Sequence, residues 1–220
     1  MTAVEGVPAP LTRTTRNAVA AVLADAFTDD PWAAHVTGPR RRGLAPLMRT
    51  PVALCAERGG VVRAREDGGA LVGAATWTPG TRRGTGVADA LRTGSLSLPW
   101  HLGPAGFARL LRDEAALAAV LDPVVGRSDA YLWVLGVRRD RHGRGLGRAL
   151  VARVAADAAA HGFGRLVLST DSPANVAVYE AMELRLLTTA RRPSGLTAHV
   201  LARPARDDAA DQPPRRGSPR

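Results

Sequence analysis

The stretch "VRRDRHGRGLGRAL", residues 137–150, decides the fold because it places five arginines and three glycines within fourteen positions. It follows directly on the apolar run "YLWVLGV", residues 131–137. The first amides of a helix have no partner within the helix, and the helix dipole favours an anion at that end. An apolar strand, a glycine-rich turn and a helix in this order therefore predict a phosphate-binding loop.

Three kinds of phosphate loop compete for this stretch. A Walker loop needs a Gly-Lys-Ser/Thr sequence, and the chain contains no lysine. The dinucleotide-binding fingerprint needs a third glycine where Arg148 stands, and no acidic ribose partner follows the next strand. What remains is a valine followed five residues later by His142 and then by alternating glycines.

Hydrophobic periodicity and turn residues predict the other elements of the chain. Helices are expected at residues 14–28, 43–58, 86–96, 104–121, 145–161 and 173–182. Strands are expected at residues 60–66, 70–79, 131–137, 165–170, 184–190 and 196–202. Pro31 is expected to stop the first helix, and Gly136 near the end of its strand predicts a β-bulge there.

The order strand, helix, strand from residue 131 to residue 170 indicates a parallel strand pair with a crossover helix. We therefore expect a mixed α/β sheet. Residues 1–203 are predicted to form a single domain, in which 79–129 is a helical insertion. Residues 204–220 are rich in proline, arginine and aspartate without hydrophobic period, and are expected to be a disordered tail.

Composition narrows the partners of the protein. The net charge is +10, but all 30 basic residues are arginine and the chain has no isoleucine, which is typical of a GC-rich genome. The arginines are spread among acidic residues, so we expect a solvated basic surface and no nucleic acid partner. The single cysteine, Cys55, allows no internal disulfide, and no His, Cys and carboxylate spacing predicts a metal site.

The expected compartment is the cytoplasm. The opening "MTAVEGVPAP" lacks the basic start and apolar stretch of a signal peptide. No uninterrupted apolar run approaches the roughly 20 residues that a bilayer requires, so no membrane partner is expected.

Two motifs resemble those of the GNAT superfamily of N-acetyltransferases. The first is V-x-x-x-x-(Q/R)-x-x-G-x-(G/A), matched from Val137 to Gly147, and the second is "STDSPANVAVYEAMEL", with Asn175, Tyr179 and Glu180 at the characteristic places. More narrowly, "ADAFTDDPWAAHV" and "GAATWTPG" look like the puromycin N-acetyltransferase family, over about residues 11–203. The resemblance implies a mostly antiparallel sheet with a splayed parallel pair and helices on both faces, an α/β fold that some schemes class as α+β.

The resemblance also implies that acetyl-CoA is the cofactor and where it binds. The backbone of Leu135, Gly136 and Val137 is expected to hold the pantetheine arm, and Asn175 is expected either beside the cofactor or as a helix cap. The diphosphate is expected at the amides of His142, Gly143, Arg144, Gly145, Leu146, Gly147 and Arg148. Two positions depart from the family: His142 replaces Gln or Arg, and Glu183-Leu184 replaces Gly-Phe in the turn after the tyrosine helix. Backbone amides make the main diphosphate contacts, so the first change is tolerable.

The implied reaction is direct attack of a neutral amine on the acetyl thioester. Tyr179 is the family's candidate for protonating the leaving sulfur. Relatives often carry a glutamate where this chain has Ser169, which leaves Asp171, Asp30, His35 or a water as the base.

The insertion 79–129 is expected to lie over the acceptor side of the cleft, with Asp30 and Trp100 as substrate-binding residues. A covered and partly aromatic pocket favours a small-molecule amine, such as an antibiotic or a metabolite. Two alternatives stay open: acetylation of protein lysines or N-termini, and a non-catalytic domain that senses acyl-CoA. The protein is expected to be a monomer or a homodimer.

Overall fold

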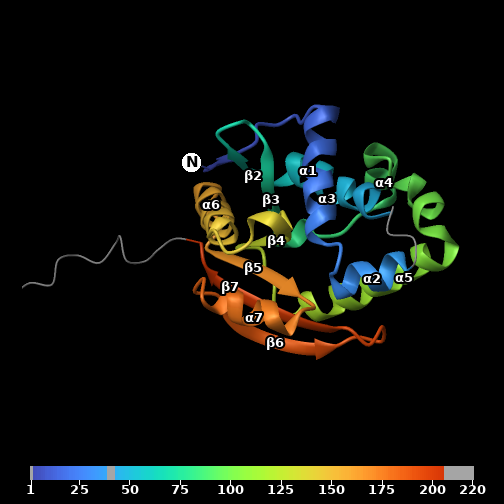
Figure 1. Ribbon diagram of the computed structural model, residues 1–220. Coiled ribbons are helices and arrows are strands. Elements are labelled where there is room, and N and C mark those ends of the chain that lie inside the picture. The colour runs from blue at the N-terminus through green and yellow to red at the C-terminus, as the bar shows by residue number, and fades with distance from the viewer. Residues whose placement is uncertain (1, 39–42, 206–220) are drawn as a thin grey trace, which may run out of the picture.

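The computed structural model describes residues 2–38 and 43–205. A seven-stranded sheet forms the centre of the molecule, in the order β1-β2-β3-β4-β5-β7-β6 (Figure 1). Its strands are β1 (Thr2–Gly6), β2 (Gly60–Glu66), β3 (Leu71–Pro79), β4 (Asp129–Val137), β5 (Arg165–Thr170), β6 (Arg185–Arg191) and β7 (Thr197–Pro204). Every neighbouring pair is antiparallel except β4 and β5. The predicted mixed, mostly antiparallel α/β fold is confirmed.

The helices are α1 (Arg13–Ala26), α2 (Pro31–Thr37), α3 (Leu44–Arg58), α4 (Val87–Thr93), α5 (Leu98–Leu121), α6 (Leu146–Ala160) and α7 (Pro173–Glu180). Short 3₁₀ turns occupy Gly80–Arg82, Ser95–Ser97 and Arg139–Arg141. The crossover helix between the parallel strands is α6, as the order of elements predicted.

The prediction for Pro31 was wrong, because the proline begins a helix. Asp30 caps α2, and its carboxylate accepts hydrogen bonds from the amides of Trp32 (2.9 Å) and Ala33 (3.1 Å). Proline suits the first helical position, where its missing amide would have had no partner. Helix α2 was therefore not predicted from the sequence, nor was β1, which pairs with β2 at the edge of the sheet.

Helix α5 is longer than predicted and kinked. It begins at Leu98 and passes through Gly103, whose φ of 73° and ψ of 164° are not helical, before Pro104 starts the second part. The kink lies in the segment 79–129, which packs through α4 and α5 against α2, α3 and β7. A side chain at Gly103 would strain this backbone conformation, so glycine allows the insertion to bend over the molecule.

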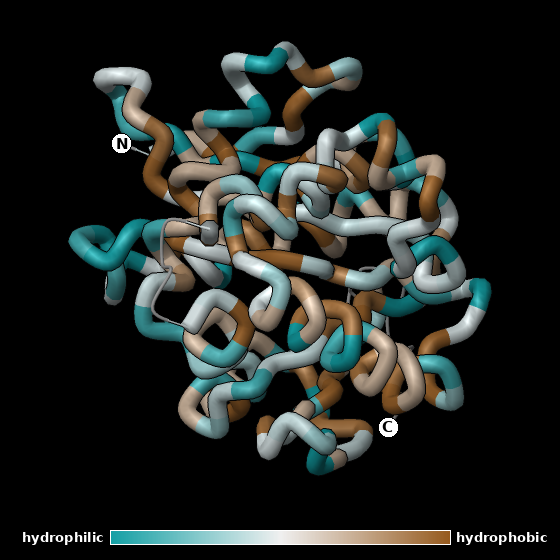
Figure 2. The backbone as a smooth tube through the Cα atoms, turned by 90° about the vertical axis from the view of Figure 1, so that its right-hand side faces the viewer, coloured by the Kyte–Doolittle hydropathy of each residue, from teal (hydrophilic) through white to brown (hydrophobic). Residues whose placement is uncertain are grey.

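Two apolar layers enclose the sheet. On one face α6 packs with side chains such as Leu150 and Val154 against β2, β3, β4 and β5. On the other face α1 and α3 pack with Leu23 and Val52, and the C-terminal part of α5 continues that layer toward β7. In Figure 2, several of the loops that protrude furthest are largely hydrophilic.

The parallel pairing of β4 with β5 is short. It runs from Asp129 opposite Arg165 to Leu132 opposite Leu168, and beyond Leu132 strand β4 pairs with β3 alone. A register shift opposite Thr76 leaves Trp133 unpaired with β3 at the same point. The expected splayed strand pair is therefore present.

The bulge predicted at Gly136 lies instead at Trp133. Gly136 keeps its register with Ala74, and its role is the close approach of α1. A Cβ atom at Gly136 would come 2.7 Å from Ala26 Cβ and 3.1 Å from Leu23 Cδ2. Glycine is therefore required there by packing.

The last strand extends slightly beyond the predicted domain boundary at residue 203. Pro204 closes β7, and Ala205 is buried in the core. The rest of the predicted tail, residues 206–220, lies outside the described residues.

Replacing Gly136 by alanine tests this packing. We expect Gly136→Ala to lower the free energy of unfolding by about 1–3 kcal/mol, because the added methyl group overpacks the contact with α1. Gly164→Ala is the matched control, since no atom lies within 4 Å of a Cβ at Gly164. Urea denaturation of both variants measures the difference, and equal stability would contradict the close contact.

Candidate active site

A cleft of about 1440 Å³ opens where β4 leaves β5. Its walls come from the end of β4, the loop before α6, the turn between β5 and α7, and helices α2, α3 and α5. The predicted site residues that line it are Asp30, Leu135, Gly136, Val137, His142, Gly143, Gly145, Leu146, Gly147, Arg148, Asp171, Asn175 and Tyr179. Arg144 and Trp100 are not among the lining residues.

The loop before α6 offers unpaired backbone donors. Gly143 and Gly145 both have φ of 75°, the left-handed conformation that glycine adopts freely, and Gly145 is the N-cap of α6. Within the described chain, the amides from Gly143 to Arg148 donate no hydrogen bond to another backbone or side-chain group. Successive free amides at a helix N-terminus form an anion-binding site.

His142 braces this loop. Its Nε2 lies 3.0 Å from the carbonyl oxygen of Val137. A carbonyl oxygen only accepts, so Nε2 carries the proton and donates it. The histidine thereby ties the end of β4 to the start of the loop, at the place where the family has Gln or Arg.

The loop arginines have different partners. Arg138 pairs with Asp140, Arg139 with Asp29, and Arg141 with Glu66 at 2.5 Å. In the described part of the chain, Arg144 has no ion pair or hydrogen bond and is exposed. It is therefore the loop cation available to an anion outside the cleft.

Arg148, which lines the cleft, donates to the carbonyl oxygen of Ala181. This bond connects the first turn of α6 with the end of α7.

Asn175 holds the turn between β5 and α7. Its side-chain amide donates to Thr170 Oγ1 at 3.3 Å, and the backbone amide of Ser172 donates to the same oxygen at 3.3 Å. Asn175 thus supports the local fold while it lines the cleft.

The turn after α7 accommodates the departure at Glu183-Leu184. Glu183 has φ of 68°, and the amide of Leu184 donates to the carbonyl oxygen of Tyr179 at 3.1 Å. The left-handed residue here is glycine in the family pattern, and glutamate adopts it at a cost of roughly 1–2 kcal/mol. Leu184 is buried in the core, so the turn keeps its shape.

Tyr179 projects from α7 and is half-buried beside the α6 layer. Burial raises the pKa of its hydroxyl to about 12, and the charges of Asp30 and Tyr131 act in the same direction. The phenol therefore stays protonated at neutral pH and is available as a donor.

A buried ion cluster lies behind the wall of the cleft. Arg192, which follows β6, pairs with Asp113 on α5 at 2.5 Å and also with Asp171 after β5. Ser194 donates to the other oxygen of Asp113 at 2.7 Å. The side chains of Arg192 and Asp113 are each 1% exposed, so this cluster fastens the insertion to the sheet in an environment with little screening.

Burial also raises the pKa of the two predicted acidic residues. For Asp30 the burial effect exceeds the opposing hydrogen bonds from Ala33 and Trp32, and Asp171 adds repulsion. For Asp171 the burial effect exceeds the opposing charge of Arg192. Both carboxyl groups line the cleft but are engaged, one as a helix cap and the other in an ion pair.

Glu114 was missed in the sequence. It lines the cleft from α5, and burial raises its pKa to about 7, with Asp113 adding to the shift. Across the cleft wall, Tyr131 and Ser169 share a hydrogen bond of 2.7 Å between their hydroxyl oxygens. In the sequence, Asp113 and Glu114 are adjacent acidic residues in a segment rich in leucine and alanine. No local pattern indicates which of the two faces a cavity.

Charge divides the cleft into two ends. Arg141, His142 and Arg148 line it at the loop before α6, together with the free amides. Asp30, Glu114 and Asp171 line the other end from the start of α2, from α5 and from the end of β5, together with the ion pair of Arg83 and Asp122. One end therefore suits an anion and the other a cation.

Two residues that the sequence analysis named lie elsewhere. Trp100 is 89% exposed near the start of α5 and does not line the cleft. His35 lies on α2 and offers its backbone oxygen to Arg109 Nε at 2.6 Å, but does not line the cleft.

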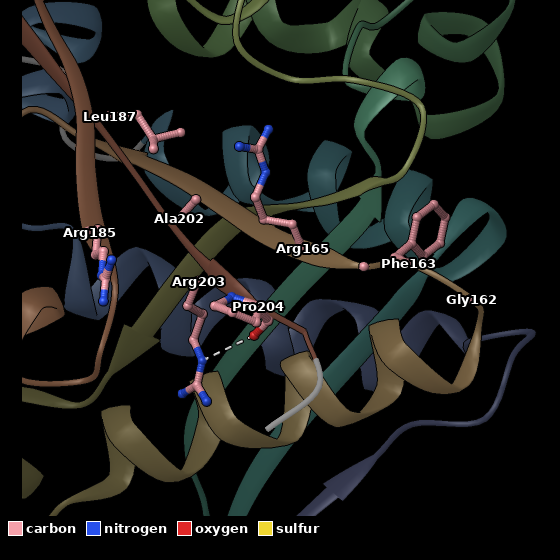
Figure 3. Close-up of a pocket in the computed structure, with 9 residues that line it drawn as sticks. Gly162, Phe163, Arg165, Arg185, Leu187, Ala202, Arg203 and Pro204 are labelled. Carbon is pink, nitrogen blue, oxygen red and sulfur yellow. Dashed lines mark hydrogen bonds between the residues drawn. The ribbon is translucent and has the colours of Figure 1, made fainter. Parts of the chain in front are cut away.

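A second hollow, of about 660 Å³, lies between the loop after α6 and strands β5, β6 and β7 (Figure 3). Its cations include Arg165, paired with Asp129, and Arg203, paired with Glu183. None of the predicted site residues lines this hollow.

Among residues 2–38 and 43–205, no group of three or more His, Cys, Asp or Glu side chains is arranged to hold a metal ion. In the same residues no helix has the length and apolar character needed to cross a membrane.

Comparisons with known proteins identify the family. A sequence model described as the acetyltransferase (GNAT) family matches residues 28–183, more than half of the chain. The protein therefore belongs to the GNAT family of acetyltransferases, whose members use acetyl-CoA as co-substrate. No curated protein sequence matches the chain.

Solved structures share the fold at low identity. A protein from Desulfovibrio desulfuricans assigned to the GNAT family has a TM-score of 0.58 and 16% identity, covering 94% of this chain and 100% of its own. The ribosomal-protein-S18-alanine N-acetyltransferase of Escherichia coli has a TM-score of 0.54 and 17% identity, and the match covers 93% of this chain and 94% of that protein. The polyamine N-acetyltransferase of Drosophila melanogaster has a TM-score of 0.56 and 13% identity, and the match covers 93% of this chain and 100% of that protein.

Removing the buried guanidinium tests the ion cluster. We expect Arg192→Gln to lower the free energy of unfolding by about 3–5 kcal/mol, because Asp113 and Asp171 lose their buried counter-charge. Arg191→Gln is the control, because Arg191 is the adjacent arginine and its side chain is exposed. Urea denaturation gives both values, and a loss below about 1 kcal/mol for Arg192→Gln would contradict the cluster's role.

Proposed function

We propose that the protein transfers the acetyl group of acetyl-CoA to the primary amine of a small molecule. The observation that carries this proposal is one cleft with free amides and cations at one end and four carboxyl groups, one of them paired with Arg83, at the other. A polyanionic acyl donor and a cationic acceptor suit the two ends, which would bring thioester and amine together.

The residues of the loop fit coenzyme A. The free amides from Gly143 to Arg148 and the dipole of α6 suit its diphosphate, and Arg144 suits a phosphate outside the cleft. Where β4 parts from β5, the backbone of Leu135, Gly136 and Val137 lines the cleft and suits the amides of the pantetheine arm. When bound, acetyl-CoA supplies an activated acetyl group.

Tyr179 is proposed as the donor to the leaving sulfur. With the pKa of the phenol near 12 and that of a free thiol about 8.5, complete transfer of the phenol proton to the departed thiolate is uphill unless Tyr179 is reprotonated at the same time. The hydroxyl therefore donates a hydrogen bond that becomes a proton transfer as negative charge develops on sulfur.

The segment 79–129 is proposed as the cover of the acceptor end, within one domain formed by residues 1–203. Four exposed apolar side chains line the cleft there and at α7: Val87, Leu96, Leu111 and Val178. Apolar walls around a few acidic groups favour an amine with an apolar body over a polar polyamine. The resemblance to the puromycin N-acetyltransferase family supports an antibiotic or a metabolite of that kind.

Release of free thiol across a panel of amines tests this function. The panel holds puromycin, 2-phenylethylamine, spermidine and a lysine-containing peptide, each with acetyl-CoA. We expect an apolar amine to be acetylated with kcat/KM at least about tenfold above spermidine, because one extra apolar contact is worth roughly 1–3 kcal/mol. Turnover of the peptide alone would overturn the small-molecule assignment in favour of protein acetylation.

Tyr179→Phe separates an enzyme from a sensor of acyl-CoA. We expect kcat to fall about 100-fold or more, which is the usual contribution of a positioned acid. Calorimetry should show acetyl-CoA binding with unchanged affinity, since the hydroxyl acts on the leaving sulfur. Unchanged turnover in the variant would remove Tyr179 from the mechanism.

A further inference from the structure

We propose that Glu114 is the general base that takes the proton from the acceptor ammonium. This assignment rests on the proposed acetyl transfer and names a residue on the inserted helix α5, where neither the family resemblance nor the sequence motifs place a base.

Elimination among the carboxyl groups of the cleft leads to Glu114. One carboxylate oxygen of Asp30 accepts hydrogen bonds from two amides at the start of α2, and Asp171 is paired with Arg192. Asp122, at the end of α5, is paired with Arg83 at 2.6 Å. In the part of the chain that the structure describes, Glu114 makes no ion pair or hydrogen bond. It is the carboxyl group of this cleft that has its oxygens free for a ligand.

The surroundings of Glu114 set its proton affinity. Asp113 on the same helix and Asp171 after β5 face it with like charge, and Arg192 after β6 faces it with opposite charge. Tyr131 on β4 is near enough for Glu114 to raise the pKa of its hydroxyl. Since Arg192 is already shared by two carboxylates, it compensates Glu114 only in part.

The result is a carboxyl group with a pKa of about 7. Both forms are populated at neutral pH, which is the condition under which a general base is most effective. An ordinary glutamate, with a pKa near 4.3, would hold the proton of an ammonium far less well.

The position of Glu114 is fixed by its neighbour. Asp113 binds Arg192 and Ser194 behind the wall, so the preceding residue anchors α5 to the sheet while Glu114 turns to the cleft. Arg109, one turn earlier, holds α5 to α2 through the carbonyl oxygens of His35 and Val36. Both anchors lie within five residues of the base.

The proton balance closes without a further reactant. Glu114 accepts one proton from the ammonium and later releases it to solvent. The amine nitrogen then bonds to the acetyl carbon as the C–S bond breaks, and Tyr179 gives its proton to the sulfur. The second proton of the nitrogen restores Tyr179 through water. The products are the amide, free thiol and one proton.

The pH profile of Glu114→Gln tests the assignment, with the most rapidly acetylated amine of the panel as the probe. In the wild type, kcat/KM should fall below pH about 7 and stay level from there to the pKa of the amine, because the enzyme itself deprotonates the ammonium. E114Q should lose about 100-fold at pH 7 and rise tenfold per pH unit across that range, because it depends on the free amine. E114D should keep the level region at a lower rate.

Glu57→Gln is the matched control, since it makes the same chemical change at an exposed glutamate of α3 that does not line the cleft. It should keep kcat/KM within about twofold and the wild-type profile. A wild-type profile in E114Q overturns the assignment of Glu114 while the acetyl transfer stands. Absence of turnover with every amine overturns the proposed function and this assignment together.

Thermal unfolding tests the same carboxyl group without turnover. Burial raises the folded pKa of Glu114 to about 7, so the ionised form costs the folded state stability as pH rises from about 4.5 to 7. E114Q should therefore melt at a higher temperature than the wild type at pH 8 and at nearly the same temperature at pH 5. An equal difference at both pH values would show that the carboxylate is not desolvated, and would overturn the assignment.

Discussion

The separation of β4 from β5 after Leu132 is the constraint on which the site depends. Up to that point the strands pair in parallel, and side chains alternate regularly between the two faces. The unpaired residue Trp133 then shifts the alternation, so that Tyr131 and Val134 face the same side although they are three residues apart. Beyond Trp133, β4 pairs with β3 alone and keeps its packing against α1. The sheet therefore opens between β4 and β5 while β4 stays paired with β3. Loss of both pairings would leave the end of β4 without a neighbouring strand.

A second constraint fixes helix α5 next to this opening. The insertion reaches over the sheet on α5, and the buried pair of Arg192 with Asp113 joins that helix to the far end of the chain. Burying a charge is costly unless it is paired, so the cluster tolerates few alternative arrangements of α5. The kink at Gly103 allows the helix to start over α3 and end on the sheet. Rigid fastening at this end gives the cleft a defined wall.

The sequence predicted the parts of the fold that local physics controls. The loop before α6 was predictable, because glycines and a helix start are visible in fourteen consecutive residues. The sheet class followed from the order of elements, and β5 was predicted to the residue. The start of α2 was missed because proline both ends and begins helices, and the short β1 gives little pattern. The bulge at Trp133 was misplaced to Gly136, since a glycine serves equally for a bulge or for contact with α1.

The candidate site divides in the same way. The expected cofactor loop lines the cleft, because backbone amides depend on local conformation, which also explains why His142 and Glu183 fit where other residues are usual. Trp100 lies outside, because an aromatic residue in an insertion has no local signal for the direction of its side chain. The position of Glu114 depends on the ion pair of its neighbour Asp113 with Arg192, 79 positions away, and no local sequence pattern predicts such a pair.

The two ends of the cleft depend on different parts of the fold. The proposed acyl-donor end is built from backbone at a strand-to-helix junction, and it exists once the sheet is formed. The proposed acceptor end takes its free carboxyl group from α5, so it is complete only when the insertion is docked. Asp113 and Glu114 divide the two tasks between adjacent residues, one buried in an ion pair and the other turned to the cleft. If Glu114 is the base, as proposed, proton removal is linked to the insertion, which is also the segment proposed to select the amine.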